Sequence, residues 1–183
     1  MDFSRLIEPS FWTPVRRIYL VWTLLVFFGF LSVHVYPVQN ALWLWLGLVV
    51  FGVWQMREAG RLEPAGSPQQ ESPQQESPQQ RFFALWLGLI ALGLLVSAAA
   101  FQIRALGGLV GYLGVFWLGL LAFGHLVTGW WRGWLEPYHL TAAAQVGAAV
   151  LALFFPRWQY LIAAVAAGGA MLALLVSVPD EAA

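Results

Sequence analysis

Leu106–Leu140, LGGLVGYLGVFWLGLLAFGHLVTGWWRGWLEPYHL, is the stretch that best indicates how this chain folds. A long apolar run, a short loop rich in aromatic residues and the start of another apolar run follow one another in it. A helix needs roughly 20 predominantly apolar residues to cross the hydrocarbon core of a bilayer. The stretch therefore predicts a transmembrane helix, a short loop and the beginning of a second such helix. It also holds two of the chain's three histidines.

The composition of the whole chain indicates a membrane environment. Hydrophobic residues make up 60% of the 183 residues, charged residues 10%, and the mean hydropathy is +0.70. Soluble domains contain only about 45–50% apolar residues. The formal net charge is zero and the nine arginines are scattered, so the clustered basic face of a nucleic-acid-binding protein is missing from the sequence. The sequence has no cysteine or lysine, which excludes disulfides, thiolate metal sites and Schiff-base chemistry.

Six apolar segments predict an all-α polytopic integral membrane protein, a bundle of about six transmembrane helices. The segments are 18–36, 41–56, 82–101, 106–130, 140–155 and 158–178. They lack the period-two alternation of barrel strands, so helices, which satisfy their own backbone hydrogen bonds, are the expected form. The predicted parts are an interfacial segment (1–17), a two-helix hairpin (18–56), a linker (57–81), a four-helix bundle (82–178) and a C-terminal tail (179–183).

The predicted linker differs in composition from its surroundings. It contains SPQQE, SPQQE and SPQQR in tandem, with a proline every five residues and few apolar side chains. Such a composition cannot bury a hydrophobic core, so we expect an extended, disordered or partly polyproline II segment. We interpret it as a spacer between the two helical parts, with docking of a partner as the alternative.

The arginines predict which way round the chain lies in the membrane. Cytoplasmic loops of membrane proteins are enriched in lysine and arginine. If the N-terminus is cytoplasmic, seven of the nine arginines fall on that side, and Arg104 and Arg157 fall on the other. Both termini, the linker and the loop from Trp130 to His139 are therefore expected in the cytoplasm. The expected location is the cell membrane, of the prokaryotic inner-membrane type.

A phrase of tryptophan, leucine and glycine recurs at Leu44–Gly52, Leu85–Gly93 and Phe116–Gly124. The spacings between the three copies are unequal and successive membrane helices run antiparallel, which argues against a simple structural repeat. We interpret the phrase as shared composition, with descent from duplicated hairpins as the alternative. The eleven tryptophans are expected to anchor helix ends at the membrane surfaces, because indole rings prefer the headgroup region.

Small residues align on one face of two predicted helices. At 100° per residue, three glycines of the fourth segment fall on the same line as His125. Because small residues let another helix approach closely, we predict that His125 faces protein and not lipid. The fifth segment has a similar line of residues four apart. The predicted helix-packing residues are Gly107, Gly111, Gly114, Thr141, Gln145 and Ala149.

His125, Glu136 and His139 are the polar side chains that could carry chemistry. Two imidazoles and a carboxylate suit a divalent metal ion or proton exchange. Haem b held by His125 and His139 is a second interpretation, although His125 would lie about 8 Å deeper than the loop beside His139. The structural alternatives are a neutral His125 bonded to a neighbouring carbonyl or to Thr128, and a Glu136 that only favours a helix N-terminus.

Motifs typical of enzymes are missing from the sequence. It contains no Gly-x-Ser-x-Gly, no His-Glu-x-x-His and no glycine-rich phosphate loop. We therefore expect a multi-pass protein without catalytic machinery: an accessory or packing subunit of a larger membrane complex or homo-oligomer, or a binder or transporter of a small neutral solute. One alternative is a haem- or metal-binding electron-transfer subunit that uses His125 and His139. Another is a transporter with a proton switch at His125.

Overall fold

The computed structural model describes residues 14–36, 43, 45–47, 49–54, 78–133 and 135–177, and these form helices and turns without a strand. The α-helices are α1 (Pro14–Val35), α3 (Pro78–Gln102), α4 (Leu113–Arg132), α5 (Leu135–Phe154) and α6 (Gln159–Ser177). Two 3₁₀ helices, η3 (Arg104–Tyr112) and η4 (Pro156–Trp158), join α3 to α4 and α5 to α6. Residues 45–47 and 49–54 are also helical and are called the Trp45–Trp54 segment below. For these residues the prediction of an all-α fold is confirmed.

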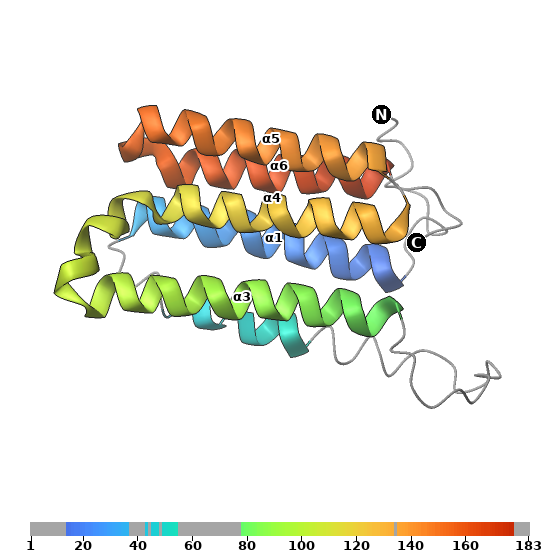
Figure 1. Ribbon diagram of the computed structural model, residues 1–183, viewed down its shortest axis with the longest axis horizontal. Coiled ribbons are helices and arrows are strands. Elements are labelled where there is room, and N and C mark those ends of the chain that lie inside the picture. The colour runs from blue at the N-terminus through green and yellow to red at the C-terminus, as the bar shows by residue number, and fades with distance from the viewer. Residues whose placement is uncertain are drawn as a thin grey trace.

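The helices run alternately in opposite directions along one common axis (Figure 1). α5 packs against both α4 and α6, and α6 also packs against α1. α3 lies on the other side of α1 and α4, and the Trp45–Trp54 segment, drawn in cyan, lies beside it. The first residues of α1, α3 and α5 are at one end of the bundle, and η3 is at the opposite end. This up-and-down order is the one that short connections between helices favour.

Small side chains dominate the contact between α6 and its neighbours. Ala163, Ala164 and Ala167 of α6 are completely buried. A Cβ atom on Gly168 would lie 3.0 Å from Cβ of Phe27 in α1, so the two helices approach closely at this point. Apolar helices associate through such close packing, because in lipid no hydrophobic effect drives them together. The last helix is thereby fixed against the first.

Local sequence features define several helix ends. α3 begins at Pro78, a position where the missing N–H of proline has no cost. α4 is followed by Gly133, whose φ of 68° is the left-handed conformation that ends many helices and favours glycine. At the other end of α4, the backbone N–H of Gly114 donates to Oε1 of the buried Gln159 at 3.1 Å. Gln159 thus supplies an acceptor to the first turn of α4 from the start of α6.

In the part of the chain that the structure describes, four helical stretches are long and apolar enough to cross a membrane. They are Ala84–Gln102, Arg104–Trp131, Glu136–Phe154 and Pro156–Ser177. α1 contains a shorter apolar stretch, Tyr19–Val35. Large apolar side chains are exposed along these helices, for example Leu95 and Val165. Such a surface is unfavourable in water and favourable in hydrocarbon.

Several helix boundaries differ from those expected from the sequence, and α1 already begins at Pro14, inside the predicted interfacial segment 1–17. α3 begins at Pro78, so the last proline of the predicted linker already belongs to a helix. Residues 57–77 of the predicted linker, the first thirteen residues and the tail lie outside the described residues. α5 begins at Leu135 and not at residue 140, because a helix tolerates a proline such as Pro137 in its first turn. Glu136 therefore lies in the first turn of α5, where a negative charge is favourable.

Candidate functional site

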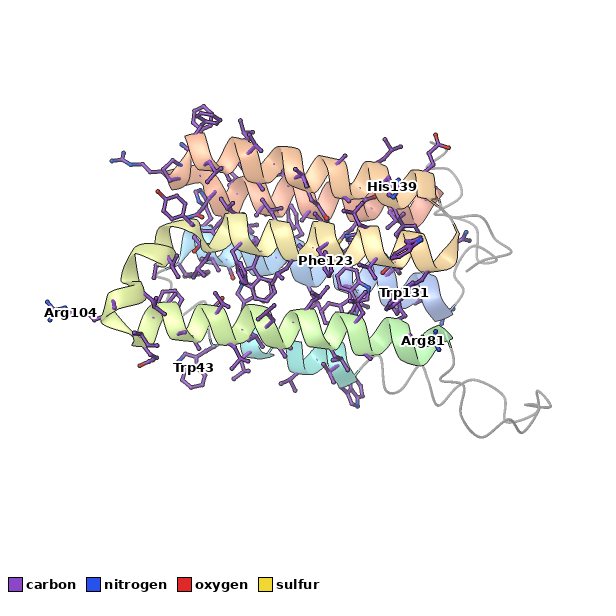
Figure 2. All side chains as sticks on the ribbon, viewed as in Figure 1. Trp43, Arg81, Arg104, Phe123, Trp131 and His139 are labelled. Atoms are coloured by element: carbon purple, nitrogen blue, oxygen red, sulfur yellow. The ribbon has the colours of Figure 1, made fainter. Side chains whose placement is uncertain are left out.

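A cavity lies between α1, the Trp45–Trp54 segment, α3 and α4, with one methionine of α6. It encloses about 780 Å³ of space, part of which is open to the surroundings. Figure 2 shows side chains of α3 and α4 meeting between the two ribbons. Valine, leucine, isoleucine and methionine form part of the lining. The aromatic lining residues are Tyr19, Trp22, Trp45, Phe82, Trp86 and Trp117.

α1 and the Trp45–Trp54 segment form the first hairpin beside this cavity. A Cβ atom on Gly29 would lie 2.8 Å from Cζ2 of Trp45, and one on Gly52 would lie 2.8 Å from Cζ2 of Trp22. Each indole therefore lies directly on the backbone of a glycine in the opposite helix. The relation is reciprocal, because each helix carries a tryptophan and, seven residues later, a glycine. Seven residues are close to two helical turns, so both lie on one face.

α3 and α4 form a second hairpin by the same arrangement. A Cβ atom on Gly93 would lie 2.3 Å from Cη2 of Trp117, and one on Gly124 would lie 2.9 Å from Cη2 of Trp86. Within each helix the tryptophan again precedes the glycine by seven residues. We call each contact of this kind a Trp–Gly pair. The recurrent sequence phrase thus has a defined role in packing, which shared composition alone does not explain.

Trp45 and Trp117 join the two hairpins. Their rings stack with centroids 5.3 Å apart and planes inclined by 24°. Both rings also line a second cavity, which encloses about 420 Å³ and includes Ser97 and Tyr160 in its lining. The stacked pair is therefore a wall that the two cavities share.

The indole N–H groups of the second hairpin are bonded to hydroxyl groups. Trp117 Nε1 donates to Ser97 Oγ at 3.1 Å, and Trp86 Nε1 donates to Thr128 Oγ1 at 3.2 Å. Each hydroxyl in turn donates to the carbonyl of the glycine that the tryptophan covers, at 2.8 and 2.7 Å. Both hydroxyls stand four residues after that glycine. The pattern in α3 and α4 is therefore Trp-x6-Gly-x3-Ser/Thr. It gives a hydrogen-bond acceptor both to the indole N–H of the opposite helix and to the hydroxyl group.

In the first hairpin, only one of the two indole N–H groups has a hydrogen-bond acceptor among the described residues. Trp45 Nε1 donates directly to the carbonyl oxygen of Gly29 at 3.0 Å. Nε1 of Trp22 is buried and has no hydrogen-bond partner in the described part of the chain. The residue four positions after Gly52 is Met56, which has no hydroxyl group. A buried N–H without an acceptor is uncommon and unfavourable. Trp22 is thus the exception among the four Trp–Gly pairs.

His125 lies behind the wall of the cavity and is completely buried on α4. Its Nδ1 is 2.7 Å from the carbonyl oxygen of Leu121 and 3.1 Å from Oε1 of Gln145. Because a carbonyl oxygen only accepts, Nδ1 carries a hydrogen, and Nε2 is the bare nitrogen of the neutral ring. Within the described residues, neither this Nε2 nor the amide nitrogen of Gln145 has a partner. Trp86 packs against the imidazole at an interplanar angle of 74°, with ring centroids 5.0 Å apart.

The burial of His125 agrees with the prediction that this residue faces protein. The other two residues of the predicted metal set are at the surface. Glu136 and His139 are both exposed, and Figure 2 shows His139 near the N-terminal end of α5. Among the described residues, no group of three His, Cys, Asp or Glu side chains is placed to hold a metal ion. The predicted set is not assembled because α5 starts earlier than expected and leaves His139 exposed. The predicted pair of haem ligands is separated in the same manner, because His125 is buried and His139 is exposed.

The glycine line predicted beside His125 is only partly a packing face. Gly114 is buried, and a Cβ atom on it would lie 3.0 Å from Oε1 of Gln159. Gly107 and Gly111 are exposed, and a Cβ atom on either would meet no atom within 4 Å. Both lie in η3, and a 3₁₀ helix has three residues per turn where an α-helix has 3.6. The 100° projection from His125 therefore does not extend to these two glycines.

The residues predicted to pack on α5 lie toward its neighbours. Thr141 and Gln145 are buried, and Ala149 packs against the core cluster. Thr141 Oγ1 is 2.9 Å from the carbonyl oxygen of Pro137 in its own helix and 3.4 Å from that of Ala170 in α6. This face of α5 therefore lies between α4 and α6.

The tryptophan-lined cavity is the feature that the sequence analysis does not predict. A usable signal is present, because a Trp-x6-Gly spacing occurs at residues 22–29, 45–52, 86–93 and 117–124. The spacing places tryptophan and glycine on one helix face. Only the fold shows which glycine each indole covers and that the four indoles surround a common space.

Comparisons with protein-family models, with curated proteins and with solved structures found no match to this chain.

Proposed function

We propose that this chain is an integral membrane protein of about six spans that binds a small, uncharged, apolar solute in the tryptophan-lined cavity. Four apolar helical stretches long enough to cross a membrane support the membrane assignment. The cavity carries the binding role, because indole rings and aliphatic side chains from several helices line one shared space.

The lining of the cavity favours a neutral solute over an ion. Among the described residues that line the cavity, none has a charged side chain. An isolated ion in apolar surroundings loses its hydration and is strongly disfavoured. Indole and aliphatic surfaces instead contact hydrocarbon or aromatic groups over a large area. A solute that already dissolves in the bilayer fits these walls.

The arrangement of arginines supports an orientation with both termini in the cytoplasm. Arg81 and Arg104 lie at opposite ends of α3 (Figure 2). Arg16 and Arg17 are in the first turn of α1, at the same end of the bundle as the start of α3 (Figure 1). The end with more arginines is the cytoplasmic one in most membrane proteins.

Photolabelling tests the binding role. The protein in lipid nanodiscs is irradiated with a dodecane that carries a diazirine, and adducts are mapped by mass spectrometry. We expect adducts on residues that line the cavity, such as Leu120. Ile90→Trp fills the cavity and should suppress these adducts, whereas Leu92→Trp on the exposed face of the same helix should keep them. Adducts confined to lipid-facing residues, or cavity adducts unchanged in Ile90→Trp, would contradict the proposal.

His125 supports cofactor binding as a second candidate function. Its buried Nε2 has no partner among the described residues, and its Nδ1 is bonded to the carbonyl of Leu121. Histidines that bind a metal through one nitrogen usually donate the other N–H to such an acceptor. An absorption spectrum of the protein purified from its native membrane tests this. A Soret band or a bound metal that is lost in His125→Ala but kept in His34→Ala would favour a cofactor at His125, and a colourless, metal-free protein would favour the solute.

A further inference from the structure

The tryptophan-lined cavity and the second cavity follow one another along the axis of the bundle. On α3, the residues that line the tryptophan-lined cavity fall within 82–90, and those that line the second cavity fall within 94–101. α1 shows the same order. On α4, which runs in the opposite direction, Leu113 of the second cavity comes before Leu120 of the tryptophan-lined cavity. The two spaces are therefore successive sections of one path between the helices.

The stacked rings of Trp45 and Trp117 separate these two sections. Among the described residues, they are the two that line both cavities. Hydrogen bonds hold the two rings in place, because Nε1 of Trp45 donates to the carbonyl oxygen of Gly29 and Nε1 of Trp117 donates to Ser97 Oγ. The pair is thus a fixed partition across the path.

We infer that this partition limits the length of the solute, which is a linear hydrocarbon chain lying along the bundle axis. The inference rests on the proposed function, because it names the class of solute for the same cavity. From Phe82 to Ile90, the part of α3 that lines the tryptophan-lined cavity, the helix advances about 12 Å. From Phe82 to Phe101, at the far end of the second cavity, it advances about 28 Å. The partition leaves less than half of this length to the solute.

A chain longer than the tryptophan-lined cavity gains nothing from its additional carbons. Its end is stopped by the indole rings and turns out into lipid, where methylene groups have the same apolar surroundings as before binding. Without the partition, the end of the chain would enter the second cavity and make dispersion contacts with its walls. The side chain at position 45 therefore decides whether additional carbons contribute to binding.

Competition between octane and hexadecane tests the inference. Each alkane is titrated against the diazirine-bearing dodecane in the same nanodiscs. The measured quantity is the ratio of the two concentrations that halve the labelling of Leu120, which lines the tryptophan-lined cavity. Comparison of this ratio between the wild type and a variant removes the difference in partitioning of the alkanes, because the bilayer is unchanged.

We expect Trp45→Ala to shift the ratio about tenfold in favour of hexadecane, which corresponds to about 1.4 kcal/mol. Trp45→Leu removes fewer atoms from the core, so it should destabilise the protein less and shift the ratio in the same direction by a smaller factor. Labelling of Leu120 shows that a variant keeps the cavity. If Trp45→Ala does not fold, Trp45→Leu decides the test.

A second substitution distinguishes loss of the partition from a general loosening of the bundle. Leu94 lines the second cavity, so Leu94→Trp fills that cavity. In the Trp45→Ala protein it should return the ratio to the wild-type value. Leu95→Trp is the matched control on the exposed face of α3, and it should leave the shifted ratio of Trp45→Ala unchanged.

The outcomes separate the inference from the proposed function. Labelling of Leu120 with the wild-type ratio in both Trp45 variants would overturn the inference and keep the solute-binding role. A shifted ratio that Leu94→Trp does not reverse would also overturn it, because the chain would then not enter the second cavity. Absence of labelling at Leu120 in the wild type would overturn both.

Discussion

Cη2 of Trp117 lies so near to Gly93 that a Cβ atom on the glycine would be only 2.3 Å from it. Such a distance is far inside van der Waals contact, so the indole occupies the space that any other residue would fill at this position. The ring cannot easily move away, because it stacks on Trp45 and its N–H is bonded to Ser97. Gly93 is therefore required by the packing of α3 on α4.

The first prediction follows from this contact. Gly93→Ala should destabilise the protein by about 1–3 kcal/mol, the usual cost of forcing additional atoms into a packed core. Gly88→Ala is the matched control on the same helix, because a Cβ atom there meets nothing within 4 Å. It should be neutral or stabilising by up to about 1 kcal/mol, since alanine favours helix. The free energy of unfolding in mixed micelles measures both, and equal effects of the two substitutions would refute the packing argument.

The hydroxyl of Ser97 gives the second prediction. Ser97→Ala leaves the indole N–H of Trp117 buried without its acceptor, which should cost about 1–2 kcal/mol of stability. Ser177→Ala, an exposed serine bonded only within α6, should have a much smaller effect.

A double-mutant cycle isolates the bond between Ser97 and Trp117. In a Trp117→Phe background the indole N–H is already absent, so Ser97→Ala should cost less than in the wild type. The same free energies of unfolding are compared for the four proteins. A cost of Ser97→Ala that is independent of residue 117 would show that the hydroxyl serves only its own helix.

The sequence predicts the helical fold well because apolar length is a strong and local signal. A run such as Arg104–Trp131 contains too many consecutive apolar residues for most alternatives to a membrane helix. The burial of His125 is also predictable, because small and polar residues share one face of α4. The conformation of residues 104–112 is not, since 3₁₀ and α-helical turns have similar composition but different angular spacing. For that reason the sequence analysis wrongly places Gly107 and Gly111 on the helix-packing face.

The cavity shows the limit of sequence reasoning more clearly. Tryptophan in a membrane protein usually indicates an interfacial position, and exposed residues such as Trp130 and Trp158 fit that expectation. Trp22 and Trp86 instead lie in the bundle, where they line the cavity. Whether an indole faces lipid or a glycine depends on the register between two helices. That register is a tertiary property, which a local pattern does not contain.

Gln159 gives the third prediction. Its Oε1 accepts from the backbone N–H of Gly114, although the two residues are far apart in sequence and belong to different helices. Gln159→Leu keeps most of the volume but leaves that N–H at the start of α4 unbonded, so the loss of stability should be about 1–2 kcal/mol. Gln102→Leu changes an exposed glutamine and is the control. Hydrogen exchange should also become faster at Gly114 in Gln159→Leu, and unchanged exchange there would argue against the capping role.

The orientation in the membrane gives the last prediction, which uses the absence of cysteine from the sequence. A single introduced cysteine is then the only thiol in the chain, so labelling has no background. Arg81→Cys and Arg104→Cys place it at opposite ends of α3, both at exposed positions (Figure 2). With both termini cytoplasmic, a maleimide that cannot cross membranes should label Arg104→Cys in intact cells. Arg81→Cys should react only after the membrane is permeabilised.

Each result of this labelling bears on a different part of the proposal. Opposite sidedness of the two cysteines is required if α3 spans the membrane, whichever way round it lies. Reaction of Arg81→Cys alone in intact cells would keep the span and reverse the orientation, against the arginine count. Reaction of both cysteines, or of neither, in intact cells would contradict the membrane span of α3. It would also contradict the apolar surroundings in which the cavity is proposed to bind a solute. Arg157→Cys, in η4 between α5 and α6, should follow Arg104→Cys and so extends the test to the second half of the bundle.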